Sequence, residues 1–275
     1  MTGTYPYRHG IIANEWTDRT SFGPVYNTGD AAHTYIGHET RKLDGTSPAN
    51  LRVTTIGDEL RYSNNGQSKV VAVSGKDRGA ILLAGKRGTA YMYMDKSGRF
   101  ASSTYYMKEH PDWHARYYAG TPQDRWMGQS WTPLLPEAAY ARSMPEGQPW
   151  HRPFVGGSSR FPFVLPKGDG YYPQLIRTPF GDEATLDFAR AAIEGENLGR
   201  NPAGVTDLLG VSLSTHDYVN HGFGPESRVS QDHLLRVDRL LAGFFEYLDK
   251  RIGLDNVVIA LTADHGFMNA PEYRA

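Results

Sequence analysis

Three short, almost continuous apolar runs stand out along the chain, at residues 69–74, 207–213 and 256–261. Such runs lack the polar alternation of a half-exposed strand and are typical of strands buried on both faces of a parallel sheet. We therefore predict three buried strands. Residues 75–79, Gly-Lys-Asp-Arg-Gly, are expected to form a loop at the carboxyl end of the first, and residues 80–84 to begin a helix or form another buried strand.

Segments with helical periodicity lie before and between these runs. Residues 51–60 are expected to form a helix that Thr54 or Thr55 caps. Residues 181–193 carry apolar side chains on one face, which predicts an amphipathic helix. The longest predicted helix covers residues 231–252. Its expected buried face is apolar and consists of Leu234, Leu235, Val237, Leu241, Phe244, Phe245 and Leu248.

This alternation of apolar strands and helices predicts an α/β fold with a mostly parallel sheet sandwiched by helices. We predict that residues 1–85 form the first part of the core and residues 181–275 the second. Between them, residues 86–180 are rich in Pro, Gly and Trp, with one short helix expected at 110–120, where Pro111 suits the first helical position. This middle region is predicted to be an inserted, loop-rich cap over a site.

The overall composition excludes several classes of protein. The net charge is −1, from 29 Lys and Arg against 30 Asp and Glu, so no nucleic acid is expected as a partner. No apolar run approaches the roughly 20 residues that span a bilayer, so we expect no stable membrane insertion. The absence of cysteine excludes disulfides and thiolate metal sites.

Two carboxylate–imidazole pairs follow the second and third predicted strands. Asp217 and His221 are four residues apart, so both can face one point on a turn or helix, and Asp264 and His265 are adjacent. Each pair taken alone is better explained without a metal: Asp217 and His221 as a solvated Asp and a surface His, and Asp264 and His265 as a pair that hydrogen-bonds or caps a neighbouring element. Together they favour metal binding, because the carboxyl ends of parallel strands open on one edge of a sheet. Carboxylate oxygen and imidazole nitrogen suit Zn²⁺.

Two cations follow the first predicted strand. Residues i and i+2 of an extended segment point to the same side, so Lys76 and Arg78 are expected to converge on one anion. Arginine suits a bidentate contact with a phosphoryl group. The alternative is that either cation pairs with Asp77, which lies between them.

The chain resembles the alkaline phosphatase superfamily, and more closely the bacterial phosphate-irrepressible alkaline phosphatases, which are relatives of nucleotide pyrophosphatase/phosphodiesterases. The resemblance is carried by segments in the order expected of the family, namely residues 2–6, 9–14, 76–81, 217–221 and 262–266. It extends over nearly the whole chain. The Lys-Asp-Arg element at 76–78 is the most discriminating, because the diesterase branch is not expected to carry it.

The resemblance implies two Zn²⁺ ions in the full-length protein. Asp217 and His221 match ligands of one zinc ion, whereas Asp264 and His265 match ligands of the other. The neighbouring His216 is interpreted as a structural histidine rather than a ligand. The remaining ligands of the family are not found within residues 1–275.

The resemblance also implies a phosphate site and a reaction. Asn14, Lys76 and Arg78 match residues that hold the oxygens of a phosphate monoester. The implied activity is zinc-dependent monoester hydrolysis through a phosphothreonine intermediate. The family's nucleophilic threonine would lie upstream of Met1. We therefore expect the chain to be an internal segment of a longer protein, with little or no turnover by itself.

Other functions remain open from the sequence alone. A phosphodiesterase or nucleotide pyrophosphatase is possible on the same scaffold, and a sulfatase is disfavoured by the absence of cysteine. A remnant that binds zinc or phosphate without turnover is the non-enzymatic alternative. From the resemblance we expect small phosphate monoester substrates, a monomer, and a periplasmic or secreted location.

Overall fold

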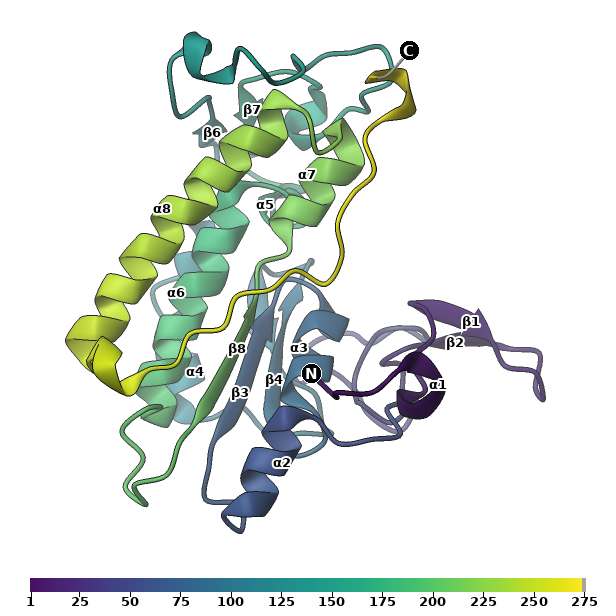
Figure 1. Ribbon diagram of the computed structural model, residues 1–275, viewed down its shortest axis with the longest axis vertical. Coiled ribbons are helices and arrows are strands. Elements are labelled where there is room, and N and C mark those ends of the chain that lie inside the picture. Colours follow the sequence, from purple (N-terminus) through teal and green to yellow (C-terminus); the bar gives the residue numbers. More distant parts are fainter. Residues whose placement is uncertain (274–275) are drawn as a thin grey trace. The chain divides into compact units, whose positions relative to one another are not determined.

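The computed structural model describes residues 1–273 and has the α/β architecture that the apolar pattern predicts (Figure 1). The chain divides into two compact units, and each is built from two separate stretches of sequence. Unit 1 consists of Met1–Pro122 with Asp187–Ser212, and unit 2 contains the rest. Neither unit is therefore a simple stretch of sequence, and the predicted three-part division into 1–85, 86–180 and 181–275 stays a prediction.

Unit 1 is organised around a four-stranded sheet in the order β5-β4-β3-β8. The strands are β3 (Val70–Ser74), β4 (Thr89–Met94), β5 (Arg99–Ala101) and β8 (Leu208–Ser212). β3 pairs in parallel with both β4 and β8, whereas β5 is antiparallel to β4. The sheet is thus mixed but mostly parallel. Two of its strands lie in the region predicted to be loop-rich, because β4 and β5 fall between residues 86 and 122.

Both faces of this sheet are covered. Helix α3 (Asp77–Ala84) packs Ala80 and Ile81 against small and apolar strand residues on one face. On the opposite face, the rings of Tyr91 and Phe100 contact Phe188 of α6 (Pro179–Glu196) with ring centroids 5.2 and 4.9 Å apart. Helix α4 (Asp112–Tyr118) covers the same face, and Figure 1 shows it across the strands from α3. Burial from two sides explains why β3 is apolar at every position but its last.

The remaining elements of unit 1 lie before β3. Helix α1 (Pro6–His9) is a single turn, and β1 (Glu15–Thr17) pairs with β2 (Pro24–Tyr26) as an antiparallel hairpin. Helix α2 (Ile56–Ser63) begins at the capping box of Thr55 and Asp58, in which each side chain bonds the other's backbone N–H. This confirms one of the two predicted caps.

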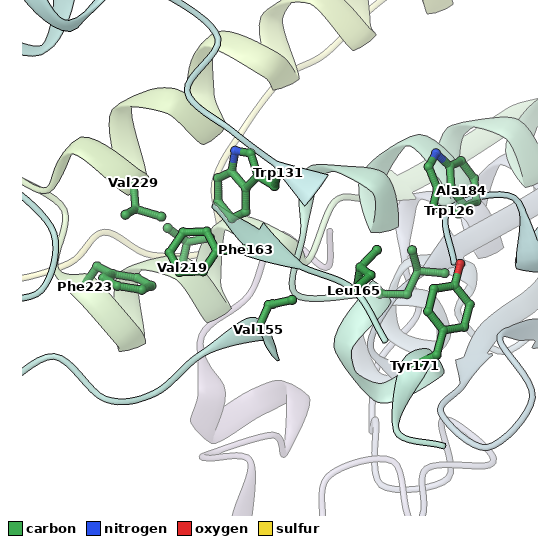
Figure 2. Close-up of a cluster of buried hydrophobic side chains, with 11 residues drawn as sticks. Trp126, Trp131, Val155, Phe163, Leu165, Tyr171, Ala184, Val219, Phe223 and Val229 are labelled. Carbon is green, nitrogen blue, oxygen red and sulfur yellow. The ribbon is translucent and has the colours of Figure 1, made fainter. Parts of the chain in front are cut away.

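Unit 2 is built around the helices α7 (Thr215–Phe223) and α8 (Arg228–Arg251) and a two-stranded sheet of β6 (Ser130–Trp131) and β7 (Phe163–Val164). Its short helices are η1 (Pro122–Asp124), η2 (Glu137–Tyr140), η3 (Val155–Gly157), α5 (Tyr171–Leu175), η4 (Leu254–Asn256) and η5 (Pro271–Tyr273). A cluster of buried apolar side chains joins these elements (Figure 2). It comprises Trp126, Trp131, Val155, Phe163, Leu165, Tyr171, Leu175, Ala184, Val219, Phe223 and Val229.

One buried carboxylate anchors the N-terminal part of α8. The side chain of Asp232 is fully buried and accepts hydrogen bonds from Trp131 Nε1, Leu134 N and Tyr140 Oη, each at 2.6 Å. Arg236, one turn further along α8, donates to the same carboxylate at 2.8 Å. A buried charge is costly unless it is paired and hydrogen-bonded, and here both conditions are met. Asp232 therefore ties α8 to the loop after β6.

The predicted strand at 256–261 is wrong. After η4 the chain pairs with no strand within residues 1–273, and the backbone bonds of residues 256–261 are local turns, from Asn256 N to Gly253 O and from Val257 N to Leu254 O. The side chain of Val258 is 97% exposed and that of Leu261 84%. An apolar run becomes a buried strand only where a neighbouring strand satisfies its N–H and C=O groups.

The predicted buried face of α8 is also wrong in part. Leu234 is 51% exposed, although Phe244 and Leu248 are buried as expected. The face that packs inward begins with Val229 and continues one turn later with His233. The hydrogen bonds of Asp232 and His233 determine which side of this end of the helix packs inward. Leu234 lies next to that side and is exposed. Counting apolar residues alone could not show this.

Candidate active site

The predicted cation pair lies where β3 ends and α3 begins. The expected loop over 75–79 is only partly correct, because α3 begins at Asp77 and Lys76 is its N-cap residue with extended backbone (φ −122°, ψ 137°). Arg78 is already helical. The inference that Lys76 and Arg78 share one side of an extended segment is therefore wrong, since the backbone changes conformation between them. Both residues nevertheless lie at the carboxyl end of a parallel strand, as predicted.

Close packing at this junction explains the glycine that follows. A Cβ on Gly79 would lie 2.4 Å from Ser74 Oγ and 2.9 Å from Ser212 Oγ, which are at the ends of β3 and β8. Ser74 Oγ also accepts a hydrogen bond from Lys76 N at 3.0 Å. The start of α3 is thus pressed directly against the strand ends, and the backbone that carries both cations has little freedom.

The Asp77 carboxylate is hydrogen-bonded by neutral donors. Its Oδ1 accepts hydrogen bonds from Tyr26 Oη and from Arg78 N, both at 2.6 Å, and its Oδ2 accepts one from Gly45 N at 2.8 Å. Within the described residues, its carboxylate makes no ion pair with the side chain of Lys76 or Arg78. The alternative that Asp77 pairs with its neighbours is therefore not what the structure shows. The guanidinium of Arg78 instead donates from Nη1 to Tyr26 Oη at 3.4 Å.

Asn14, the third predicted phosphate contact, is exposed and directly precedes β1. Its carbonyl oxygen accepts a hydrogen bond from Asn27 N at 2.9 Å, just after β2. The hairpin of β1 and β2 therefore carries Asn14 at one end and supplies Tyr26 to Asp77 and Arg78. The hairpin thus connects two of the three predicted phosphate residues, Asn14 and Arg78.

In unit 2, three of the four predicted metal ligands gather around one oxygen atom. Asp217, in the first turn of α7, has its Oδ1 3.5 Å from His221 Nε2 and 3.6 Å from His265 Nε2. Asp264 Oδ2 lies 3.6 Å from the same nitrogen of His265, but the Asp264 side chain is 90% exposed. The ring of Phe267 lies against both imidazoles, with centroids 5.0 and 5.3 Å away.

These distances exceed those of ordinary hydrogen bonds but are similar to the separations between ligands of one tetrahedral ion bound at about 2.0 Å. The donor set, one carboxylate and two imidazoles, therefore fits a zinc site in its chemistry. Within residues 1–273, however, no three His, Asp or Glu side chains have the geometry of a complete metal site. The two predicted pairs also do not stand apart, because His265 contacts Asp217.

His216 differs from these ligand candidates because its ring already has a protein partner. Its Nδ1 is 3.0 Å from Nδ1 of His233, whose Nε2 is 2.8 Å from Asp182 Oδ2. Burial lowers the pKa of His216 to about 4, and the nearby His233 acts in the same direction. The geometry agrees with a structural role for this residue.

Sequence reasoning missed Tyr26 and Gly45, which complete the surroundings of Asp77. Tyr26 is separated from Asp77 by 51 residues and Gly45 by 32, so no local spacing reveals either contact. The one available signal was the acidic residue between two cations. A carboxylate at that position needs hydrogen-bond or ionic partners, and the partners of Asp77 are neutral hydrogen-bond donors.

Comparison with known proteins now places the chain. It belongs to the type I phosphodiesterase / nucleotide pyrophosphatase family, whose profile matches residues 1–275. Among curated relatives, alkaline phosphatase PhoV of Synechococcus elongatus is 42% identical over 275 residues, which is 99% of this chain and 50% of PhoV. Alkaline phosphatase PafA of Elizabethkingia meningoseptica is 40% identical over 272 residues, which is 97% of this chain and 49% of PafA.

A third relative, from Myroides odoratus, is named a calcium-transporting ATPase and is 40% identical over 280 residues, covering 100% of this chain and 50% of its own length. The solved structure of a quadruple variant of PafA superimposes with a TM-score of 0.83 at 36% identity, over 93% of this chain and 50% of that one. The α/β fold is thereby confirmed. The chain spans about half the length of the curated relatives it matches.

Proposed function

We propose that the protein containing this chain hydrolyses small phosphate monoesters at a centre with two zinc ions, through a phosphothreonine intermediate on a threonine that residues 1–275 do not supply. The arrangement of Lys76 and Arg78 at the end of β3 carries the proposal. A lysine and an arginine at one strand end suit a group that bears two negative charges. PhoV and PafA, both named alkaline phosphatases, support the same activity.

The solved PafA variant adds support for the individual residues. One threonine, one asparagine, one lysine and one arginine are changed in it. The last three are spaced along PafA as Asn14, Lys76 and Arg78 are spaced along this chain. The changed threonine lies further upstream than Met1 on the same spacing. We propose that Asn14, Lys76 and Arg78 hold the oxygens of the transferred phosphoryl group.

Each residue has a distinct task in this proposal. Lys76 supplies a point charge, Arg78 a planar donor group, and Asn14 a neutral amide donor, so that three phosphoryl oxygens can be held. Asp217, His221, Asp264 and His265 would hold the zinc ions. When bound, such ions supply positive charge to the attacking and leaving oxygens. The donors of this chain orient the phosphoryl group for in-line attack and stabilise its charge in the transition state.

A phosphodiesterase or nucleotide pyrophosphatase is the second candidate, and the family description favours it. The two activities differ in the number of phosphoryl oxygens that the enzyme must hold, because a diester has one fewer that is free and charged. A pair of cations at the end of β3 serves the additional oxygen of a monoester. The proposed location is the periplasm or the cell exterior, and a monomer is proposed. Among the described residues, no helix has the length and apolarity that crossing a bilayer needs.

The test compares two substrates and counts metal ions. The protein that contains this chain is assayed with p-nitrophenyl phosphate and bis(p-nitrophenyl) phosphate, and its zinc content is measured by elemental analysis. We expect two zinc ions and a preference for the monoester of at least about 100-fold in kcat/KM, the size of a lost charge-stabilising contact. A preference for the diester would support the second candidate. Zinc without turnover of either ester would support a binding remnant. Residues 1–275 alone, with Zn²⁺ added, should show no turnover.

A further inference from the structure

The side chain between the two cations belongs to a small, closed hydrogen-bond system in unit 1. Asp77 accepts from Tyr26 Oη, Gly45 N and Arg78 N, which occupies both of its oxygens with neutral donors. We infer that Asp77 and Tyr26 are positioning residues that orient the Arg78 guanidinium toward a phosphoryl group and so contribute to selectivity for monoesters. The inference rests on the proposed function, since it assigns Arg78 a phosphoryl contact.

The direction of each hydrogen bond in this system follows from chemistry. A guanidinium can only donate, so the contact from Arg78 Nη1 to Tyr26 Oη uses a lone pair of the phenol. The single hydroxyl proton of Tyr26 is then directed at Asp77 Oδ1, 2.6 Å away. Burial and the charge of Asp77 both raise the pKa of Tyr26, so the hydroxyl stays protonated and remains a donor. Asp77 thus turns the phenol so that its lone pair faces Arg78.

Gly45 holds the carboxylate from the other side. Its N–H donates to Asp77 Oδ2 at 2.8 Å, and a Cβ at this position would lie 2.4 Å from that oxygen and 2.3 Å from Thr28 Oγ1. The backbone therefore approaches Asp77 as closely as only glycine permits. The loop is itself held by Thr46 N and Ser47 N, which both donate to Thr28 O. Rotation of the Asp77 carboxylate would break bonds to three separate segments.

This arrangement has a consequence for catalysis. An arginine at the second residue of a helix has several flexible side-chain torsions, and its forked donors help only if the plane of the guanidinium is oriented before the substrate binds. Tyr26 provides that orientation from a hairpin strand and Asp77 holds Tyr26. A monoester, with one more charged oxygen than a diester, depends more on that orientation.

The experiment is a double-mutant cycle on the protein that contains this chain. Arg78→Ala is expected to lower kcat/KM for p-nitrophenyl phosphate roughly 100-fold or more. Tyr26→Phe removes only a hydroxyl and is expected to lower it roughly three- to tenfold. Hydrolysis of bis(p-nitrophenyl) phosphate should change less than about twofold in Tyr26→Phe. Combining both substitutions should cost no more than Arg78→Ala alone, because the hydroxyl acts through the arginine.

Tyr140→Phe is the matched control. It removes a Tyr–Asp hydrogen bond of the same 2.6 Å length in unit 2, to Asp232. It should lower the melting temperature without changing the ratio of monoester to diester rates. Asp77→Asn, which exchanges one acceptor oxygen for a donor, should shift that ratio in the same direction as Tyr26→Phe, and both variants are checked for folding by their melting temperatures.

The outcomes separate the two claims. If Arg78→Ala leaves the monoester rate unchanged, the proposed phosphate site itself is wrong. If Arg78→Ala has its expected effect but Tyr26→Phe lowers both substrates equally, or adds its full effect to Arg78→Ala, then the site stands and the positioning role is refuted. A monoester-selective loss that disappears in the Arg78→Ala background supports the inference.

Discussion

The two groups of candidate residues, one in each unit, are constructed in different ways. In unit 1, Lys76 and Arg78 are carried by a strand–helix junction, and Asp77 between them makes three hydrogen bonds of 2.6 to 2.8 Å. In unit 2, Asp217 approaches two imidazoles at 3.5 and 3.6 Å, and His265 comes from an extended, exposed segment. The first arrangement is held by short hydrogen bonds to neutral donors, whereas the separations within the second are longer than ordinary hydrogen bonds.

The difference follows from the chemistry of the groups. Backbone N–H, phenol and carboxylate satisfy one another, so a chain can complete such a system alone. A carboxylate and the free nitrogens of neutral imidazoles are all acceptors, and they are brought together by a shared cation or by protons. A site for an anion can therefore be pre-organised by folding, whereas a site for a cation gains part of its order from binding.

The largest effect is expected at the carboxylate shared by the two imidazoles. Asp217→Ala should lower monoester kcat/KM by at least about 10³-fold, since loss of metal charge stabilisation removes several kcal/mol from the transition state. The measurement is steady-state kinetics together with zinc content, and zinc should fall in parallel. Asp255→Asn, on an exposed turn of the same unit, is the control and should leave both values unchanged. Full zinc content with full activity in Asp217→Ala would remove this residue from the metal site.

The next effect concerns the stability of unit 2, which we expect to depend on Asp232 rather than on the candidate metal ligands. Asp232→Ala leaves the donors of Trp131 and Tyr140 buried without an acceptor, and should destabilise the fold by about 3–5 kcal/mol. Denaturant unfolding measures this loss. Asp264→Ala, whose carboxylate is 90% exposed, should change the stability of the metal-free protein by less than about 0.5 kcal/mol. Equal losses of stability in Asp232→Ala and Asp264→Ala would contradict the expectation that Asp232 stabilises unit 2 and the candidate metal ligands do not.

How far the sequence predicts this molecule depends on how local each feature is. The apolar run of β3 and the periodicity of α6 and α8 are local signals, and the structure has these elements within a few residues of the predicted bounds. Residues 256–261 have the same apolar signature as β3, but a strand requires a partner that a local pattern cannot show. The orientation of α8 depended on the buried bonds of Asp232, which link residues about one hundred positions apart.

The features of the candidate site also fall into two kinds: those that local sequence predicted and those that required the fold. Lys76 and Arg78 were predicted to lie at a strand end because the loops after parallel, apolar strands all emerge at one edge of the sheet. The role of Asp77 was not predicted, because it depends on Tyr26 and Gly45 in a distant hairpin and loop. Asp217 and His221 are one helical turn apart, which the spacing indicated, whereas the contact of His265 with Asp217 required the fold.

A smaller effect is expected on the stability of unit 1 at acidic pH. The rings of His110 and His114 stack with centroids 3.9 Å apart. Their Nε2 atoms already bond backbone: His110 accepts from Ser102 N and His114 bonds the carbonyl oxygen of Phe100. Burial, followed by the neighbouring His114 and His38, lowers the pKa of His110 to about 4. A proton on His110 would therefore displace the backbone donor.

The sign of the pH effect follows from this lowered pKa. Between an unfolded value near 6.5 and the folded value of about 4, the unfolded chain binds a proton that the folded chain does not, so stability falls as the pH falls through this window. A pKa lowered this far corresponds to about 3 kcal/mol for a fully buried group. His110 is partly exposed, so solvent screening reduces the expected loss to roughly 2 kcal/mol, and His110→Gln should reduce it further. Melting temperatures at several pH values from about 8 to about 4 measure the slope. An unchanged slope in His110→Gln would locate the acid sensitivity elsewhere.

The smallest effect concerns α2, the helix that precedes β3 in unit 1. Thr55 is buried, and its Oγ1 accepts from Asp58 N at 3.3 Å while Asp58 Oδ2 accepts from Thr55 N at 2.9 Å. Thr55→Ala should cost about 1 kcal/mol, the usual loss for an N-cap. Thr54→Ala, at the neighbour that the sequence could not distinguish as the cap, should cost less than about 0.5 kcal/mol. Because Asp58 Oδ1 also accepts from Lys86 N and Arg87 N, an unexpectedly small loss for Thr55→Ala would show that this second anchor alone suffices to hold α2.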